Sequence, residues 1–300
     1  MTIAQNYWYL FGGGEGFPAA AIAYRDRVEA DGGTVQSLSC VPTEVWEWVA
    51  PVYNAQTQAM IDKADAEGFA LPSAANLALI SSTIDSLIAA SAWDTKADRI
   101  RFWGTDSGSA NFGRINAINP SDDLAVLVNA VAFVNKKGVE GDGVSAYVDG
   151  KYNPAVDAVN YALASATILL YQYKVATVGI ALYGSEVSEV RLRSAPSTIQ
   201  RINSSSNLAT AADFNQIGTI GLHRKTATDV DIQTNGTLTA TTAPLVASLP
   251  NYDLTLFATV GASNHSNAGV SIEWVGSDAS SVGLAVNTIM TNYYTQLQLL

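Results

Sequence analysis

The chain of 300 residues is long enough for one large β domain with a smaller appended unit. Only 14% of the residues are charged, the net charge is −11, and no Lys or Arg follows Lys225, which argues against nucleic-acid binding because that function needs a clustered basic face. The single cysteine, Cys40, excludes an intrachain disulfide and a thiolate metal cluster.

Targeting and membrane segments are not expected. Residues 1–11 lack the basic start and apolar core of a signal peptide. The longest apolar runs, at 126–134 and 162–173, are too short or too interrupted by polar groups to span a membrane. We therefore expect a protein made in a cytoplasm. If it acts outside the cell, a route other than secretion must carry it there.

The first segment, residues 1–16, is expected to be a docking arm. It sets aromatic side chains beside a glycine run at 12–16, and it has too few apolar residues to form a core alone. The residues expected to contact an assembly partner are Tyr7, Trp8, Tyr9 and Phe11. The alternative is that they form a first strand of the main domain.

Residues 17–105 predict an α-rich unit. Pro72-Ser73 precedes a long amphipathic helix whose apolar residues, from Leu77 to Ile88, are spaced three and four apart. Residues 34–41 are expected to be extended. The predicted helices cover residues 19–30, 44–48, 55–67 and 74–92.

Residues 106–300 predict an antiparallel β domain. Short apolar runs alternate with turns, and Asn235-Gly236 is a strong signal for a two-residue hairpin. A closing helix is predicted from an N-cap at Ser277-Asp278 to Leu297. The predicted strands cover residues 110–118, 131–136, 164–174, 177–183, 189–193, 216–224, 230–234, 254–260 and 270–275.

The chain is organised around residues 139–154. Gly141-Asp142-Gly143 predicts a tight turn, because glycine allows left-handed backbone angles and Asp can bond its own backbone. An alternating strand follows to Asp149, and Asn153-Pro154 closes it. Either face of this strand could be the buried one.

This stretch, Val139-Glu140-Gly141-Asp142-Gly143 to Asn153-Pro154, resembles the F-D-G-x-x-D-Y-V strand of concanavalin A-like (laminin-G-like) jelly-roll domains. It resembles more closely a G-N-G-T-S-S-Y-I-N-T-N-Y-N-P-S segment of such domains in structural proteins of tailed bacteriophages. Residues 59–71 and 93–100, and Asn292-Tyr293-Tyr294 near the C-terminus, are similar to helical segments beside those jelly rolls.

The resemblance implies an α+β, mainly β fold, with a docking arm (1–16), an α-rich unit (17–105) and a jelly-roll sandwich (106–300) that a C-terminal helix closes. It implies a non-enzymatic virion protein, made in the cytoplasm of the bacterial host, in a tail fibre or other peripheral appendage. The expected partners are other virion proteins through the N-terminal region and further copies of the chain, with a trimer favoured by analogy with phage fibres.

The side chains that could carry catalysis or bind a metal do not form a complete set. Asp229-Val230-Asp231-Ile232-Gln233 resembles a glucanase strand but ends in Gln, which cannot shuttle a proton. His223 and His265 do not have zinc-site spacing. Four aspartates, at 122, 123, 142 and 149, could bind Ca²⁺, but turn formation explains them more simply. We expect no catalytic residues and no cofactor.

Aromatic side chains near loops are the better functional lead. A sugar has apolar faces, so an aromatic platform flanked by Asn and Asp suits glycan recognition. The candidates for contact with a host-surface glycan are Tyr152, Tyr252 and Trp274, and the alternative is that each belongs to the core.

Two other functions stay open. One is a capsid decoration or head-fibre protein of the same particle, which needs the same docking arm and outward domain. The other is a carbohydrate-active enzyme or a free lectin, for which loss of polysaccharide hydrolysis in Asp231→Asn would be the signature.

Overall fold

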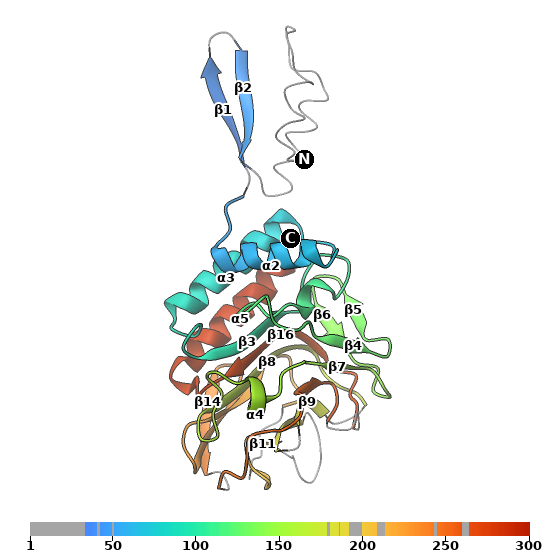
Figure 1. Cartoon of the computed structure of the whole chain (residues 1–300), viewed down its shortest axis with the longest axis vertical. Coiled ribbons are helices and arrows are strands. Elements are labelled where there is room, and N and C mark those ends of the chain that lie inside the picture. Colours follow the sequence, from blue (N-terminus) through green and yellow to red (C-terminus); the bar gives the residue numbers. More distant parts are fainter. Residues whose placement is uncertain are drawn as a thin grey trace.

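The computed structural model of the chain is shown in Figure 1. It describes residues 34–40, 43–49, 51–178, 181–185, 187–191, 200–208, 214–242, 245–259 and 264–300. The expected docking arm, with Tyr7, Trp8, Tyr9 and Phe11, and the expected helix over 19–30 lie outside the described residues.

Two antiparallel sheets form a sandwich, and helices cover the outer face of the larger sheet (Figure 1). In the larger sheet the order is β14 (Thr237–Thr242), β13 (Asp229–Thr234), β12 (Gly218–Arg224), β8 (Ala166–Lys174), β16 (Gly269–Gly276), β6 (Gly138–Glu140) and β5 (Ala132–Val134), with β3 (Ala97–Phe102) also paired to β16. In the smaller sheet the order is β11 (Gln200–Arg201), β10 (Ser188–Arg191), β9 (Ala181–Ser185), β15 (Thr255–Leu256), β7 (Tyr147–Asp149) and β4 (Val126–Val128). The expected fold class, mainly β with a closing C-terminal helix, is confirmed.

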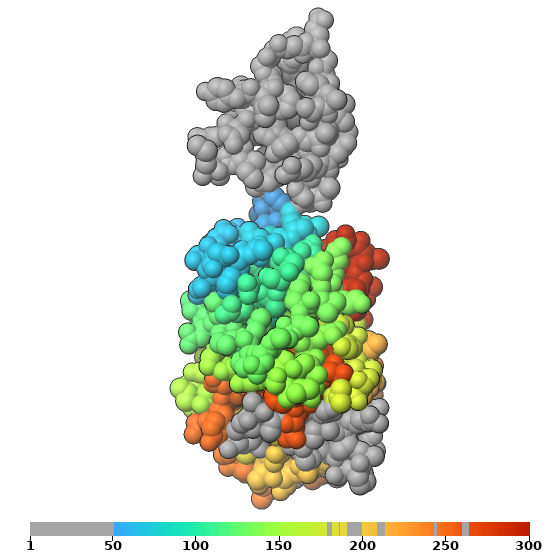
Figure 2. All heavy atoms as spheres, turned by 90° about the vertical axis from the view of Figure 1, so that its right-hand side faces the viewer, coloured from blue at the N-terminus to red at the C-terminus, as the bar shows by residue number. Residues whose placement is uncertain are grey.

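The helical layer consists of α2 (Ala55–Ala66), α3 (Ala74–Ala89) and α5 (Gly283–Leu297). Figure 2 shows the residues of α2 and α3, in blue to cyan, above the green residues of the middle of the chain. Asn54 and Ser73 cap α2 and α3 by accepting hydrogen bonds from backbone N–H groups in their first turns. Within the described residues, no helix is both long and apolar enough to cross a membrane.

Two hydrophobic cores share the larger sheet. One lies between the sheets and includes Val148, Leu170 and Leu222, and the other lies between the larger sheet and the helices and includes Leu169, Trp274 and Tyr293. The central strands are therefore buried on both faces, as in β8, where eight of nine residues are buried. This double covering explains why these strands read as continuous apolar runs rather than as alternating ones.

Hairpin and strand predictions are largely confirmed, with specific corrections. Asn235 and Gly236 both have positive φ (48° and 80°) in the tight turn between β13 and β14. The helix expected over 44–48 is wrong: these residues belong to β2 (Thr43–Val49), which pairs with β1 (Thr34–Cys40), in line with the strand preference of its Val and Trp residues.

Two other boundaries also differ. Residues 110–118 are not one extended strand but contain a short 3₁₀ helix at Phe112–Arg114. The closing helix begins at Gly283 rather than at Asp278, because a 3₁₀ turn (Ser280–Val282) comes first. Asp278 accepts a hydrogen bond from the Ser280 N–H at the start of that turn.

Strand β3 links the helical part of the chain to the sandwich. The sequence signals did not indicate a strand at residues 97–102, which precede the expected boundary at 105. All of its residues are buried, and it pairs with β16 from Ile272↔Phe102 to Gly276↔Ala97. Its Ile100 and Phe102 side chains belong to the core under the helices, whereas Arg99 and Arg101 form bonds with Glu273 and Gly150.

The Asp142 turn is built as the sequence predicts, although the strand after it is shorter, at Tyr147–Asp149. Asp142 Oδ1 accepts hydrogen bonds from the N–H groups of Val144, Ser145 and Ala146 at 2.7–2.8 Å, and these bonds hold the pKa of its carboxyl far below the ordinary value. Ala146 and Val148 are buried while Val144 is 76% exposed, so the inward face of this segment is settled.

We predict that Gly143→Val lowers the free energy of unfolding by about 1–3 kcal/mol, because a β-branched residue is strained at positive φ. Gly143 has φ +76°, and an added Cβ would also approach Val178 at 3.2 Å. Urea denaturation measures the change. Val144→Ile in the same turn is the control, expected within about 0.5 kcal/mol because the Val144 side chain is exposed. Equal stability of both variants would contradict the turn geometry.

Candidate functional site

The three aromatic residues proposed to contact a glycan differ in their exposure to solvent. Trp274 is fully buried under the helices, where its Nε1–H donates to the Ala92 carbonyl at 3.2 Å. Tyr152 is 6% exposed, and its hydroxyl donates to Asp98 Oδ2 at 2.7 Å. Neither ring has a face open to a sugar, so both belong to the core alternative. Tyr252 is 51% exposed and stays a candidate.

Tyr252 lies on a polar surface formed by two chain segments that run side by side. The Gly150 N–H donates to the Leu254 carbonyl at 3.0 Å, and the Leu254 N–H donates to the Tyr152 carbonyl at 2.9 Å. These bonds extend the pairing of β7 with β15. We use the name Tyr252 surface for the polar residues of these two segments. They are Asp149, Lys151, Asn153, Asn251, Tyr252 and Asp253.

A lysine and two carboxylates form the charged part of the Tyr252 surface. Lys151 Nζ lies 2.6 Å from Asp149 Oδ2 and 3.7 Å from Asp253 Oδ2. Partial burial favours a higher pKa for the Asp149 carboxyl, but its bonds to Lys151 outweigh this and the pKa is lowered. Burial and the hydrogen bond to Asp149 raise the pKa of Asp253. The pKa values of the two carboxyls are therefore shifted in opposite directions, although both side chains contact the same ammonium group.

Two amides complete the Tyr252 surface. Asn153 Nδ2 lies 3.5 Å from Asn251 Oδ1, and Asn153 Oδ1 accepts a hydrogen bond from the Ala155 N–H at the start of the one-turn helix α4 (Pro154–Asp157). The Ala155 N–H also lies 3.1 Å from the Pro250 carbonyl, which ties α4 to the loop that carries Tyr252. The exposed Tyr252 lies between Asn251 and Asp253 in the sequence, so this loop offers a ring, an amide and a carboxylate, a set that can stack on a sugar and bond its hydroxyls.

The same surface is not arranged for glycoside hydrolysis or metal binding. Asp149 and Asp253 both contact Lys151 Nζ, at 2.6 and 3.7 Å, so the two carboxylates are paired with one ammonium group and are not left free as the acid and base of a glycosidase. Over the part of the chain that the structure describes, no three His, Cys, Asp or Glu side chains come together as a metal site.

A buried ionic cluster lies directly behind the Tyr252 surface, and sequence reasoning missed it. Arg99 Nη2 lies 2.5 Å from Glu273 Oε1, and Arg101 Nη1 lies 3.7 Å from the same oxygen. Both guanidinium groups donate to the Gly150 carbonyl at 2.8 Å. Tyr183 donates its hydroxyl to Glu273 at 2.9 Å. Charged residues alternating with Ile100, Phe102, Ile272 and Trp274 were the only available signal.

Burial and charge act against each other in this cluster. Burial alone would raise the pKa of Glu273, but Arg99 and Arg101 outweigh it and the pKa is lowered. Burial and the neighbouring Arg99 lower the pKa of Arg101 to about 10. Burial would also lower the pKa of Arg99, but its contact with Glu273 raises it. Glu273 is therefore ionised and holds both arginines beneath the Gly150 peptide.

The residues that resemble a glucanase strand have structural partners. Asp231 Oδ1 lies 2.8 Å from Lys225 Nζ, and Asp229 accepts a hydrogen bond from the Thr226 hydroxyl at 2.8 Å. Gln233 is buried; its Oε1 lies 2.6 Å from His223 Nε2 and its Nε2 donates to the Gly283 carbonyl at 3.1 Å. Burial lowers the pKa of His223, which favours the neutral ring in this network.

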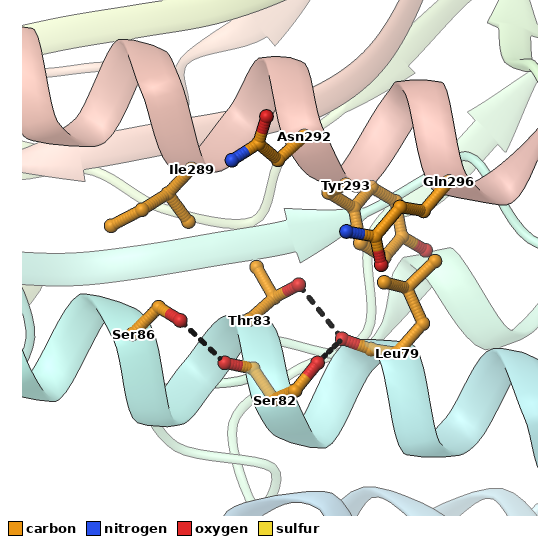
Figure 3. Close-up of a pocket in the computed structure, with 8 residues that line it drawn as sticks. All are labelled: Leu79, Ser82, Thr83, Ser86, Ile289, Asn292, Tyr293 and Gln296. Carbon is orange, nitrogen blue, oxygen red and sulfur yellow. Dashed lines mark hydrogen bonds between the residues drawn. The ribbon is translucent and has the colours of Figure 1, made fainter.

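A depression lies between α3 and α5 (Figure 3). Ser82, Thr83 and Ser86 use their hydroxyls on carbonyls of their own helix, as the dashed lines show. Its volume is about 100 Å³, well below the ~300 Å³ at which small-molecule pockets begin. The other lining residues are Leu79, Ile289, Asn292, Tyr293 and Gln296, and none of the lining side chains is charged. We regard it as a packing groove.

In comparisons with known proteins, the chain is similar only to solved structures. No protein-family model and no curated protein matches the chain. Domain 4 of an extracellular arabinanase from Geobacillus stearothermophilus, in complex with arabinotriose, is 13% identical with a TM-score of 0.40, over 64% of this chain and 99% of that one.

Two further structures are similar at the same level. A mutant Trypanosoma rangeli sialidase with trans-sialidase activity is 11% identical with a TM-score of 0.40, over 73% of this chain and 39% of that one. The binding domain of botulinum neurotoxin serotype D is 6% identical with a TM-score of 0.37, over 67% of this chain and 52% of that one. The chain thus spans about half or less of these two proteins, and we base no functional argument on scores this low.

Proposed function

We propose that the protein is a non-enzymatic structural protein of a bacteriophage particle, whose β-sandwich binds a host-surface glycan through the Tyr252 surface. The observation that carries the glycan part is the exposed Tyr252, whose sequence neighbours Asn251 and Asp253 contact Asn153 and Lys151. The virion part is supported by the resemblance of residues 139–154 to jelly rolls of tailed phages. A tail fibre or peripheral appendage is the proposed position.

The groups of the Tyr252 surface suit reversible binding better than catalysis. A half-exposed phenol ring can stack on the apolar face of a sugar without the cost of ordering a flexible side chain. Lys151 is already paired with Asp149 and Asp253, so the surface offers oriented donors and acceptors rather than a free charge. We therefore propose recognition of sugar hydroxyls, with modest affinity for each copy.

We predict that Tyr252→Ala weakens glycan binding about three- to tenfold, the change expected from losing one aromatic stacking contact. Binding is measured on an array of bacterial lipopolysaccharide and capsule fragments, followed by titration of the best ligand. Tyr252→Phe keeps the ring and should bind nearly as wild type. Leu245→Ala, at another exposed apolar position (71%), is the matched control. Equal binding by the Ala and Phe variants would place the glycan elsewhere.

We predict that the chain is found in purified virions and that deletion of residues 1–16 leaves a folded sandwich that no longer joins the particle. The reason is that aromatic side chains such as those of the proposed arm dominate binding energy when a partner buries them. Mass spectrometry of virions and circular dichroism of the truncated protein measure the two outcomes. Absence from virions would remove the virion role, and an unfolded sandwich would show that the arm belongs to the core.

The copy number per particle decides between the tail position and a capsid decoration or head fibre. Both positions use the same proposed arm and outward domain, so the glycan assay cannot distinguish them. Hydrolysis of any polysaccharide on the array, lost in Asp231→Asn, would instead favour a carbohydrate-active enzyme.

A further inference from the structure

Lys151 has an unusual backbone conformation within the Tyr252 surface. Its φ is 49°, in the left-handed region that residues other than glycine rarely adopt. Its N–H donates to Asp149 Oδ1 at 3.0 Å. The carbonyl before it, that of Gly150, accepts from Arg99 and Arg101 at 2.8 Å each. Because both arginines are buried, the backbone at Lys151 is fixed from the interior of the sandwich.

The side chain of Lys151 is fixed as well. Its Nζ lies 2.6 Å from Asp149 Oδ2 and 3.7 Å from Asp253 Oδ2, and 38% of the side chain is exposed. An ammonium group has three N–H donors, so one directed to each carboxylate leaves a third for a ligand. Two carboxylates thus hold a donor at the surface in a set direction, and one of them belongs to the residue that follows Tyr252.

Backbone strain alone does not indicate a function for Lys151. Lys136, in the turn between β5 and β6, has the same left-handed conformation, with φ 60°. What singles out Lys151 is its place, because it connects Asp149 at the end of β7 to Asp253 in the loop that carries the exposed Tyr252. A rigid donor at such a place is pre-organised for binding, since little side-chain entropy is lost when a ligand contacts it.

The charges of this region are mostly negative. Among the described residues, Asp157 adds a third carboxylate, whose Oδ2 accepts from the Asn153 N–H at 2.7 Å. Burial raises the pKa of Asp253, and the carboxylates of Asp149 and Asp157 raise it further, so one ammonium group does not neutralise the three acids. The formal charges buried behind the surface cancel; they are those of Arg99, Arg101, Glu273 and Asp98.

We propose that Lys151 is a specificity-determining residue of the glycan site, and that the site takes uncharged sugars and excludes sugars with a carboxylate or phosphate group. A hydroxyl of an uncharged sugar can accept from Lys151 and donate to Asp253, so it satisfies both groups at once. An anionic sugar would meet three carboxylates for one cation, and this repulsion disfavours its binding. This selectivity rests on the proposed glycan-binding function and adds the class of sugar to it.

The test compares binding of the full chain to uncharged oligosaccharides and to carboxylated or phosphorylated ones of the same length. We expect the uncharged sugars to bind at least about tenfold more tightly. Lys151→Gly should weaken their binding about tenfold, the loss of one hydrogen bond from a charged donor. Its melting temperature should fall by no more than about 2 °C, because glycine adopts this backbone freely and an exposed ion pair adds little stability. Lys136→Gly, the same substitution in the same backbone conformation, should bind as wild type.

A second variant tests the exclusion of acidic sugars as a gain of binding. Asp253→Asn removes one carboxylate at nearly constant size and should strengthen binding of the acidic sugars about three- to tenfold. Asp65→Asn, at an exposed position of α2, changes the net charge by the same amount and should leave the selectivity unchanged. An equal gain in both variants would assign the effect to the net charge of the chain and overturn the proposal.

The remaining outcomes separate the class of sugar from glycan binding itself. No binding to any oligosaccharide would remove the glycan function and this selectivity with it. Equal or tighter binding of the acidic sugars by the wild type would overturn the selectivity and leave glycan binding in place. Equal losses in Lys151→Gly and Lys136→Gly, or no loss in either, would overturn the role of Lys151 in the same way.

Discussion

Glu273→Gln is expected to lower the free energy of unfolding by about 3–5 kcal/mol, the cost of leaving a buried charge without its partner. Glu273 is the counterion of both Arg99 and Arg101, and all three side chains are at most 2% exposed. Glutamine keeps the shape but removes the negative charge, so two guanidinium groups would stay between the sheets without compensation. Chemical denaturation of the full chain measures the loss.

Two control variants separate the role of charge from the role of volume. Glu67→Gln removes one partner of the exposed Lys63–Glu67 pair and should change stability by less than about 1 kcal/mol. The triple variant Arg99→Met, Arg101→Met, Glu273→Leu removes every charge of the cluster and should recover the stability lost in the single variant, because an apolar replacement of a buried ion pair is often neutral or stabilising. A triple variant as unstable as Glu273→Gln would show that packing, not charge, dominates.

The acid dependence of stability gives a further check on Glu273. Its pKa is lowered in the folded state, so the folded state binds fewer protons than the unfolded chain near the ordinary value of about 4.3 for Glu. The stability that Glu273 contributes is therefore present above that pH and is lost as the pH falls through the lowered pKa. Glu273→Gln should show a shallower loss of stability on acidification than the wild type.

Local signals in the sequence predicted much of the fold. Asn235-Gly236 gave the hairpin because few other residues adopt positive φ at two successive positions. Ser73 gave the start of α3, and Asp142 gave its turn, because short polar side chains bond nearby backbone N–H groups. These features depend on residues close in sequence, so no knowledge of the tertiary structure was needed.

Features set by distant neighbours were harder to predict. In β16 all eight residues are buried, because the second sheet covers one face and the helices cover the other. Alternation therefore could not show that Trp274 faces α-helices rather than solvent. Arg99 and Arg101 make β3 look polar in sequence, and their partner Glu273 lies more than 170 residues away. Of the three proposed glycan contacts, only Tyr252, on a loop with adjacent Asn and Asp, lies at the surface in the structure.

Asp98→Asn is expected to lower the free energy of unfolding by about 2–4 kcal/mol, because a charged acceptor of several buried hydrogen bonds is lost. Asp98 Oδ2 accepts from the Tyr152 hydroxyl at 2.7 Å and from the Tyr161 N–H at 2.8 Å, and Oδ1 accepts from the Asn160 N–H at 2.7 Å. Asparagine offers one acceptor, and its amide N–H groups would face donors. Asp94→Asn, exposed in the preceding turn, is the matched control and should be nearly neutral.

The same variant tests whether the buried bonds position the Tyr252 surface. Asp98 holds Tyr152, whose carbonyl accepts from the Leu254 N–H next to Asp253. Loosening this anchor should weaken glycan binding at a temperature where the variant is still folded, whereas Asp94→Asn should bind as wild type. If Asp98→Asn is destabilised but binds normally, the Tyr252 surface is held by β7–β15 pairing alone. If its stability is unchanged, the Asp98 hydrogen bonds contribute less than their burial implies.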